Sequence, residues 1–407
     1  MPESHGEFNM HKSVSYIVVL LFSACIAACG SGSSNTTTTQ VYSQPSHTLP
    51  SLPLPPNTRM GGTIQGTALD LSVTSNTVTT FAGSAGSAGW LDAIIGTNAR
   101  FYHPTDITTN GVNFYVADYW NNAVRRVTPE GIVTTLVTGF NRPSSITTDG
   151  VNLYVTDSGS NTVRIIEIAT NAVTIIGSTS SLAGSVDSAN PADVRFFIPI
   201  GITTDGIDLY VTDSGNHTIR RINITTKAVT TFAGISRTSG ATDGGQGVAR
   251  LNRPGRITTD GVNLYLADFG NRAIRKIEIL SGTVTTIAGS STPGVAEKIS
   301  QDNNGTADGI GTAARFFQPN GITTDGTYLY VTDTYQNTVR RVDKSSPYTV
   351  TTISGVAKAF SDPTLGIGGA VDSPGTPSFF SPIGITTDGI SLFVADSENS
   401  TIRKISK

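Results

Sequence analysis

Short runs of alternating apolar and polar residues fill most of the chain, and turn-forming residues separate them. One such run, Asn152–Asp157, has Leu-Tyr-Val at its centre and follows an Asp149-Gly150 pair. Alternation with a period of two predicts half-buried β-strands, and an Asp-Gly pair between two runs predicts a hairpin turn. No segment shows a sustained apolar period of 3.6 residues, so we expect strands and almost no α-helix.

The same order of runs recurs six times. Each copy opens on a segment close to Ile-Thr-Thr-Asp-Gly, and the copies start at Ile107, Ile146, Ile202, Ile257, Ile322 and Ile385. A repeat of this size indicates a solenoid, a propeller or an array. The second copy divides into four expected strands at residues 144–148, 152–157, 162–168 and 172–176. Four antiparallel strands in about 40 residues are typical of one propeller blade.

The two ends of the repeat region predict how the ring closes. The sixth copy stops at Lys407 before a fourth strand, whereas Thr77–Gly83 has the pattern of a fourth strand with no blade before it. We expect this N-terminal strand to complete the last blade, because closure hides two sheet edges. A further strand within Thr63–Val73 is expected at the rim or in the same blade. The predicted fold is an all-β, six-bladed β-propeller of four-stranded antiparallel blades over residues 61–407.

Three segments of the third copy resemble the NHL repeat family. They are Gly201–Asn216, Thr218–Ile222 and Val229–Gly234. The resemblance extends from about Asn76 to Lys407 and implies a six-bladed propeller. It leaves the function open, because this fold carries binding modules and enzymes alike.

Charge and cysteine content exclude several classes of partner. Only 14% of the 407 residues are charged and the net charge is −3, so no basic surface for nucleic acid is expected. The two cysteines, Cys25 and Cys29, both precede residue 30. The sequence therefore predicts neither a disulfide framework nor a thiolate metal site in the propeller.

The first 60 residues have the composition of a targeting segment and a linker. An apolar run, Tyr16–Phe22, leads to Ile26-Ala-Ala-Cys29, which resembles the bacterial lipobox with Cys29 as the lipidated residue. Residues 1–29 are thus expected to be a lipoprotein signal peptide, with a plain cleaved signal or an uncleaved anchor as the alternative. Residues 30–60 are rich in Ser, Thr and Pro and are expected to be a tether. Gly30 after the cysteine favours an outer-membrane lipoprotein in the cell envelope.

Two charged positions recur in every copy and are expected to belong to the scaffold. The second strand ends in Asp118, Asp157, Asp213, Asp268, Asp333 and Asp396, and the third strand carries Arg125, Arg164, Arg220, Arg275, Arg340 and Arg403. A feature found once per repeat fits a structural device better than a site, which needs asymmetry. We expect each aspartate to cap its turn, and each arginine to pack between blades and pair with an acid.

The sequence offers little material for catalysis. The propeller region has two histidines, His103 and His217, whereas a catalytic zinc usually needs three protein ligands. No nucleophile has an evident base. We therefore predict no metal, no cofactor and no catalytic residue. A metal-dependent hydrolase or lyase with an axial metal is the alternative function, and a purely structural assembly module is a third.

Candidate binding residues lie where the copies differ. Around the proline that opens each copy, the unusual residues are His103, Asp106, Arg253 and Arg256. In the turn between the second and third strands, two copies read Ser-Gly, whereas the first has Tyr119-Trp120 and the fifth has Tyr335. Both sets are expected on the face that carries the long inter-blade loops. Because aromatic side chains stack on sugars and anchor protein partners, we predict a protein- or glycan-binding module that uses these seven residues.

Overall fold

The structure is a computed structural model. It describes residues 59–60, 63–64, 69, 71, 76–178, 180, 182–289, 307–356, 369–374 and 377–407. The chain divides into two units, residues 1–51 and 52–407, and every described residue belongs to the second. Within these ranges no helix is long and apolar enough to cross a membrane. The expected signal peptide and most of the expected tether lie outside the described residues.

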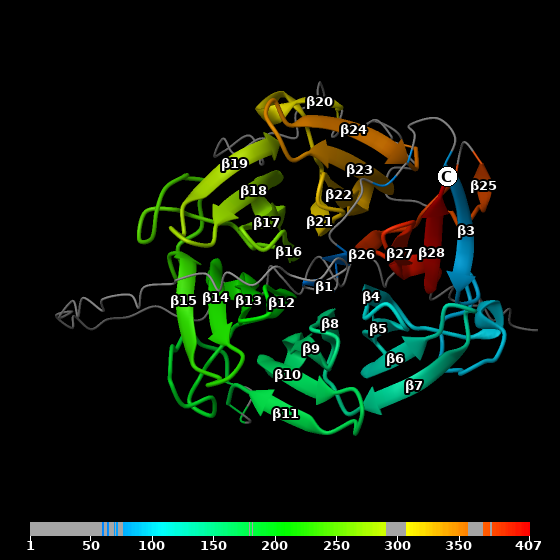
Figure 1. Cartoon of the computed structure of the whole chain (residues 1–407), viewed down its shortest axis with the longest axis horizontal. Helices are drawn as coiled ribbons and strands as arrows, with labels where there is room; N and C mark the ends of the chain where they lie inside the picture. The colour runs from blue at the N-terminus through cyan, green and yellow to red at the C-terminus, as the bar shows by residue number, and fades with distance from the viewer. Residues whose placement is uncertain are drawn as a thin grey trace, which may run out of the picture. The chain divides into compact units, whose positions relative to one another are not determined.

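Six antiparallel sheets form the ring of a β-propeller (Figure 1). We call them blades 1 to 6, starting from β4. The inner strands contact one another around the whole ring. They are β4 (Pro104–Thr109), β8 (Pro143–Thr148), β12 (Pro199–Thr204), β16 (Ile257–Thr259), β21 (Pro319–Thr324) and β26 (Pro382–Thr387). The second strands are β5 (Phe114–Asp118), β9 (Asn152–Asp157), β13 (Asp208–Asp213), β17 (Asn263–Asp268), β22 (Tyr328–Asp333) and β27 (Leu392–Asp396).

The two remaining strands of each blade complete the predicted four-stranded pattern. The third strands are β6 (Ala123–Val127), β10 (Thr162–Glu167), β14 (Thr218–Asn223), β18 (Ala273–Glu278), β23 (Thr338–Asp343) and β28 (Thr401–Ser406). The outer strands are β7 (Val133–Thr138), β11 (Val173–Ile176), β15 (Val229–Gly234), β19 (Val284–Gly289), β24 (Thr349–Ser354) and β3 (Thr77–Ala82). Short fifth strands, β20 (Gly309–Ile310) and β25 (Ser373–Pro374), extend blades 5 and 6. The predicted fold class is confirmed.

The expected turns form between the strands. Asp149 Oδ1 accepts hydrogen bonds from the N–H groups of Val151 and Asn152, and Gly150 has a φ of 95° that favours glycine. The turn between the second and third strands is usually a single turn of 3₁₀ helix. These helices are η4 (Ser158–Ser160), η5 (Ser214–Asn216), η6 (Phe269–Asn271), η8 (Thr334–Gln336) and η9 (Ser397–Asn399), while η3 (Gly96–Asn98) and η7 (Gly311–Ala313) lie between blades.

The N-terminal strand closes the ring as predicted. β3 pairs antiparallel with β28, so that Val78 faces Ile405 and Thr80 faces Arg403. Figure 1 shows the blue β3 beside the red β28. Val78 and Ala82 have no exposed surface. The last blade is therefore built from both ends of the described chain.

The strand expected within Thr63–Val73 is described only in part. Among its described residues, Thr63–Ile64 form a strand, β2, which pairs with β1 (Arg59–Met60). β2 lies against the inner strands β21 and β26. Further along, Leu69 N–H donates to Asp325 Oδ2 at 2.8 Å, which attaches this segment to blade 5. Most of residues 65–75 lie outside the described residues.

The hydrophobic core lies between neighbouring blades. Tyr115 and Ala117 of blade 1, for example, pack with Ile146, Leu153 and Val155 of blade 2. Fully burying a side chain of this size contributes about 1.5–3 kcal/mol. Each blade is thus stabilised mainly through the contacts that it makes with the next one, which favours a closed ring.

The repeated arginines form ion pairs, as predicted, and five of the six are fully buried. In every blade the third-strand arginine pairs with the aspartate that ends the second strand. Arg220 has no exposed surface, and its Nη1 donates to Asp213 Oδ2 at 2.8 Å. The guanidinium carbon also lies 5.1 Å from the ring centre of Phe196. Charge and aromatic stacking together hold the arginine inside the blade.

The prediction that these aspartates cap their turns is wrong. Asp213 makes no side-chain hydrogen bond to the backbone of η5, and the same holds for η4, η6, η8 and η9. Its Oδ1 instead accepts the N–H of Phe197 at 2.7 Å, and its Oδ2 accepts Asn216 Nδ2 at 2.8 Å. The carboxylate faces the blade interior, where these donors and Arg220 satisfy it. Burial raises the pKa of Asp213 to about 6.

Candidate ligand-binding face and channel

The residue before each inner strand occupies an unusual backbone conformation. We call these the blade-opening residues. Five of them have a positive φ: His103, Arg142, Ile198, Arg253 and Ser381. This conformation is sparsely populated for residues other than glycine, and a following proline disfavours helical values further. Side chains from the preceding blade hold it in place, because the N–H groups of Arg142, Ile198 and Ser381 donate to the Oδ1 atoms of Asn122, Asn161 and Asn337.

The opening residue of blade 4 is held by a histidine of the preceding blade, whereas the opening residues of three other blades are held by an asparagine. Arg253 N–H donates to Nδ1 of His217 at 3.0 Å. Burial lowers the pKa of His217, and the nearby Arg253 charge lowers it further. The bond needs an unprotonated Nδ1, so the position of Arg253 depends on a neutral imidazole.

Acidification is expected to destabilise the protein through His217. Because its pKa is lower in the folded than in the unfolded protein, the unfolded state binds more protons in the window just below the ordinary value of about 6.5. The stabilisation is present above that value and is lost as the pH falls through the folded pKa. We expect the free energy of unfolding, measured in urea from pH 8 to pH 5.5, to fall more for the wild type than for His217→Asn. Asparagine keeps the acceptor and does not titrate, so parallel curves for the two proteins would contradict this.

Aromatic and charged side chains gather where blades 6, 1 and 2 meet. The turn after β5 lies against the blade-opening segment, since Trp120 N–H donates to Tyr102 O at 3.1 Å. The Trp120 ring centre is 5.0 Å from Tyr119 and 6.3 Å from Tyr102. Tyr119 in turn lies 5.9 Å from His103. The turn after β5 and the blade-opening segment of blade 1 therefore lie side by side. We call the set Tyr102, His103, Tyr119, Trp120, Arg142 and Glu398 the Trp120 cluster.

Charges of both signs border these rings. The Arg142 guanidinium lies 5.1 Å from the centre of the Trp120 ring. His103 Nε2 lies 3.2 Å from Glu398 Oε1, and this hydrogen bond lowers the pKa of Glu398. Burial raises the pKa of Tyr119, with the Arg142 charge acting against it. Tyr102 is 45% exposed, so the cluster presents an aromatic surface with a cation and an anion beside it.

Tyr335 belongs to a second aromatic group on blade 5. Its ring stacks on Phe317 at 4.8 Å with an interplanar angle of 16°, and the Arg272 guanidinium lies 4.8 Å from the Phe317 ring. Tyr335 is 38% exposed. No ring contact among the described residues joins it to the Trp120 cluster. The structure thus divides the predicted aromatic residues between two groups.

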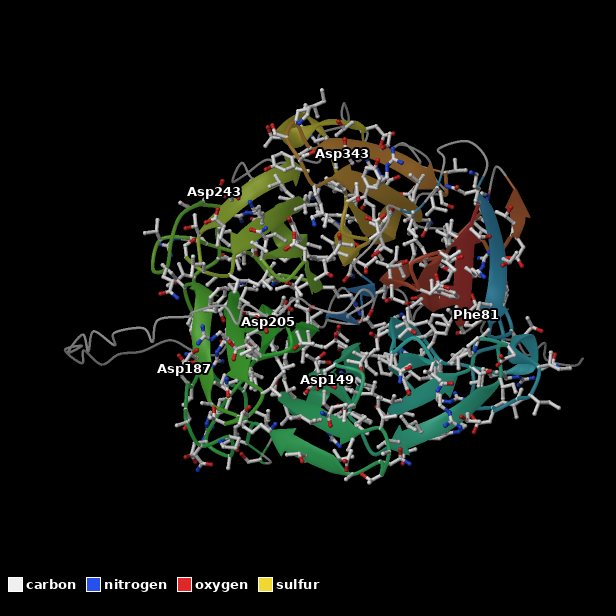
Figure 2. All side chains as sticks on the ribbon, viewed as in Figure 1. Phe81, Asp149, Asp187, Asp205, Asp243 and Asp343 are labelled. Atoms are coloured by element: carbon white, nitrogen blue, oxygen red, sulfur yellow. The ribbon has the colours of Figure 1, made fainter. Side chains whose placement is uncertain are left out.

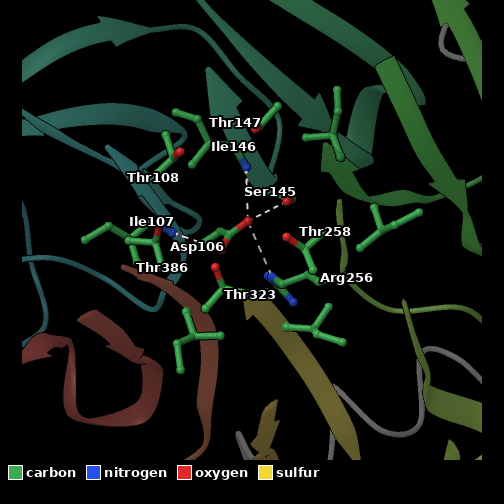
Figure 3. Close-up of a pocket in the computed structure, with 14 residues that line it drawn as sticks. Asp106, Ile107, Thr108, Ser145, Ile146, Thr147, Arg256, Thr258, Thr323 and Thr386 are labelled. Carbon is green, nitrogen blue, oxygen red and sulfur yellow. Dashed lines mark hydrogen bonds and ion pairs between the residues drawn. The ribbon is translucent and has the colours of Figure 1, made fainter. Parts of the chain in front are cut away.

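Asp106 and Arg256 meet inside the channel, although 150 positions separate them (Figure 3). Arg256 Nε lies 3.6 Å from Asp106 Oδ2. Asp106 also accepts hydrogen bonds from Ser145 Oγ and from the N–H groups of Ile146 and Ile107. Burial raises the pKa of Asp106 and lowers that of Arg256, while each charge opposes the shift of the other.

Arg256 connects four blades across the axis. Its Nη2 donates to the carbonyls of Thr105 and Ser144, each at 2.7 Å, and its Nη1 donates to Asn320 Oδ1 at 2.6 Å. Glycines in other blades make room, since a Cβ on Gly384 would lie 2.4 Å from Asp106 Cα. The remaining cavity, lined by the inner-strand threonines, measures about 30 Å³. That is room for one or two water molecules.

Sequence reasoning did not propose Tyr102 or Glu398 as binding residues, and it noted Arg142 only as positive charge at the mouth of the channel. Tyr102 and Arg142 lie next to, or at, blade-opening positions, and Glu398 follows β27. The position two places before the opening proline holds Tyr102 in blade 1 and phenylalanine in blades 3, 5 and 6, so the sequence alone does not single out Tyr102. No signal in the sequence pairs Glu398 with His103, because 295 positions separate them. Among the described residues, no group of three or more His, Cys, Asp or Glu could hold a metal ion.

Fold and repeats together define the class of this protein as a six-bladed β-propeller with NHL-like repeats. No protein-family model matches the chain. It is 32% identical over 108 residues to human NHL repeat-containing protein 2. This match covers 26% of this chain and 15% of the human protein. It is also 37% identical over 94 residues to Protein SUPPRESSOR OF QUENCHING 1, chloroplastic, of Arabidopsis thaliana, covering 22% of this chain and 9% of that protein. The chain is thus homologous in part to NHL repeat-containing proteins, as its repeats predicted, and the matches span a small part of both relatives.

Solved structures share the fold over most of the chain. A protein of unknown function from Bacteroides thetaiotaomicron superimposes with a TM-score of 0.60 at 24% identity, over 81% of this chain and 76% of that one. Auxiliary nutrient binding proteins from B. thetaiotaomicron and B. ovatus give TM-scores of 0.60 and 0.59 at 16% and 18% identity. They cover 82% of this chain and 76% and 77% of their own. At these identities the likeness shows the fold alone.

Proposed function

We propose that this propeller is a binding module that takes a glycan or a loop of another protein at the Trp120 cluster. The observation that carries the proposal is the asymmetry of the ring. In blade 1 the turn that reads Ser-Gly in blades 2 and 3 is Tyr119-Trp120. Tyr102 is exposed beside this turn, and the Arg142 guanidinium lies over the indole. A binding site needs such a departure from symmetry, whereas the scaffold does not.

The chemistry of the cluster suits a polar ligand with apolar faces. Aromatic rings stack on the C–H faces of a sugar or on apolar side chains, and Arg142, His103 and Glu398 can hydrogen-bond hydroxyl groups or a carboxylate. The rings already contact one another, so little side-chain freedom is lost on binding. We assign Tyr335 and Arg253 to the same face as further contacts for an extended ligand.

Asp106 and Arg256 take a positioning part in this proposal. Arg256 holds the carbonyls of Thr105 and Ser144, which follow the prolines next to His103 and Arg142. The channel pair therefore supports the backbone on which the cluster stands. The solved propellers named as auxiliary nutrient binding proteins give a binding role on this fold a precedent.

Loss of the indole is expected to weaken binding. Ligands are first identified with a glycan array and a pull-down on the domain that starts at Gly61. Trp120→Ala should then reduce affinity by about 5- to 30-fold in titration calorimetry, corresponding to about 1–2 kcal/mol, because the aromatic anchor of the proposed site is lost. The matched control is Trp90→Ala, since Trp90 is 51% exposed and has no part in the cluster. If folded Trp120→Ala and Arg142→Ala proteins both bind like the wild type, the site lies elsewhere.

We further propose that the propeller is anchored to the outer membrane through Cys29. The support is the lipobox-like Ile26-Ala-Ala-Cys29 and the Ser/Thr/Pro-rich tether that follows it. Cys29→Ser is expected to block lipidation, so that the protein leaves the membrane fraction or retains its signal peptide. Fractionation with intact-mass measurement checks this, and Cys25→Ser serves as the control. An unmodified N-terminus on membrane-bound wild-type protein would exclude the anchor.

A further inference from the structure

Five of the six blades have their outer strand covered by a short segment of the preceding loop. This segment forms an antiparallel bridge to the outer strand in blades 1, 3 and 4, and a short strand in blades 5 and 6. The pairs are Ala93 with Val133, Ser188 with Val229, Gly244 with Val284, β20 with β24, and β25 with β3. In these blades the backbone groups at the sheet edge therefore have a partner.

Each covering segment also supplies a carboxylate to the buried arginine of its blade. The five residues are Asp92, Asp187, Asp243, Asp308 and Asp372, at 2.5–2.8 Å from the arginine. Each also accepts the N–H and the hydroxyl of a threonine in the outer strand, as Asp187 does from Thr231. Figure 2 labels Asp187 and Asp243 close to the outer strands β15 and β19. Each of these arginines thus pairs with two aspartates, and its side chain has no exposed surface.

Among the described residues, blade 2 has neither a covering segment nor a second carboxylate. Only residues 139–142 separate β7 from β8, and none of the described residues pairs with the outer edge of β11, which lies on the outside of the ring in Figure 1. Arg164 pairs with Asp157 at 2.6 Å, and its side chain is 16% exposed. Val173 and Ile175 are 40% and 38% exposed. We call Val173–Ile176 together with Arg164 the β11 edge.

The register shows which backbone groups point outward from the β11 edge. Arg164 faces Ile175 just as Arg125 faces Thr135 in blade 1. In blade 1, Val133 N–H donates to Ala93 O and Thr135 N–H donates to Asp92 Oδ2, each at 2.9 Å. The N–H groups of Val173 and Ile175 therefore point away from β10, toward the place that a covering segment takes in the other blades.

We propose that the β11 edge binds an extended segment of another protein that carries an aspartate between small or aliphatic residues. The segment pairs antiparallel with β11. Its carboxylate forms an ion pair with Arg164 and accepts a hydrogen bond from the N–H of Ile175. The five covering segments show that such a sequence fits this surface within one molecule, and the charge of Arg164 selects the acid. A second copy fits poorly, because pairing two β11 edges brings two arginines together without a new carboxylate.

The test uses the chain's own covering segment as the probe. A fluorescein-labelled peptide with the sequence of residues 183–190, Ala-Gly-Ser-Val-Asp-Ser-Ala-Asn, is titrated into the full-length chain and followed by fluorescence anisotropy. We expect saturable binding that weakens about three- to fivefold when the peptide aspartate becomes asparagine, in line with the partly exposed position of this carboxylate in the other blades. Hydrogen exchange at Val173 and Ile175 should slow on saturation, while exchange at Val133 and Thr135 stays unchanged.

Two protein variants separate this site from a folding defect. Ile175→Pro removes an outward N–H without removing a bond to β10, so a folded variant should lose peptide binding. Arg164→Gln should lower the affinity for the aspartate peptide to the affinity that the wild-type protein has for the asparagine peptide. Thr174→Ala is the matched control and should bind like the wild type. Binding that survives both Ile175→Pro and the asparagine peptide would overturn the proposal. So would exchange already slow at Val173 and Ile175 without peptide, or a concentration-dependent dimer that Ile175→Pro abolishes.

Discussion

Deleting residues 61–83 is expected to abolish cooperative folding of the propeller. This removes β3, the outer strand of blade 6, and with it the buried Val78 and Ala82. The ring then loses a strand that pairs along its whole length with β28, and β28 becomes an open sheet edge. We expect the sharp thermal transition in circular dichroism to be replaced by a broad one or by aggregation. An unchanged melting curve would show that closure by β3 is not required.

A point substitution gives the same test without a deletion. Val78→Asp places an unpaired carboxylate in the core cluster that also holds Ile405 and Leu392, and is expected to cost about 4 kcal/mol or more. The neighbouring Thr79 is exposed on the same strand. Thr79→Asp should therefore leave the urea midpoint nearly unchanged. Equal effects of the two substitutions would contradict the strand's orientation.

Replacing Arg220 by methionine is expected to destabilise the fold by about 3–5 kcal/mol. The side chain donates to Asp213, Asp187 and the carbonyls of Arg195 and Val186. Methionine fills much of the space but leaves the carboxylate of Asp213 buried without its cation, and removing one partner of a buried pair is costly for that reason. Urea denaturation followed by circular dichroism measures the loss.

Two further substitutions serve as controls for the loss of stability in Arg220→Met. The Asp187 side chain is 45% exposed, so Asp187→Asn should cost about 1 kcal/mol or less. Arg126 is an exposed arginine on β6 and should tolerate methionine with little change. Ligand binding by Arg220→Met should stay intact in the fraction that folds, because the Trp120 cluster lies on other blades. If Arg220→Met and Asp187→Asn lower the free energy of unfolding equally, water must stabilise the Asp213 carboxylate once Arg220 is removed.

The repeat made most of the architecture predictable. Alternation marked the strands, Asp149-Gly150 marked a hairpin, and the unpaired pattern of Thr77–Gly83 marked the closing strand. These features are local or recur with a fixed spacing, so one copy informs the others. The role of Asp213 was predicted wrongly because its partner Phe197 precedes it by 16 residues, and the chain reaches that partner only through the folded blade.

The sequence by itself determined the elements, their order and the ring, because hydrophobic period and turn chemistry act between near neighbours. It also identified Tyr119, Trp120, Asp106 and Arg256 as departures from the repeat. Only the tertiary structure decided which residues these four side chains contact. Arg256 crosses the channel to Asp106, and His103 reaches Glu398 from the other end of the chain. The open edge of β11 likewise emerges only when the outer edges of all six blades are compared in space. Contacts of this kind depend on which blades become neighbours, and closure of the ring establishes that.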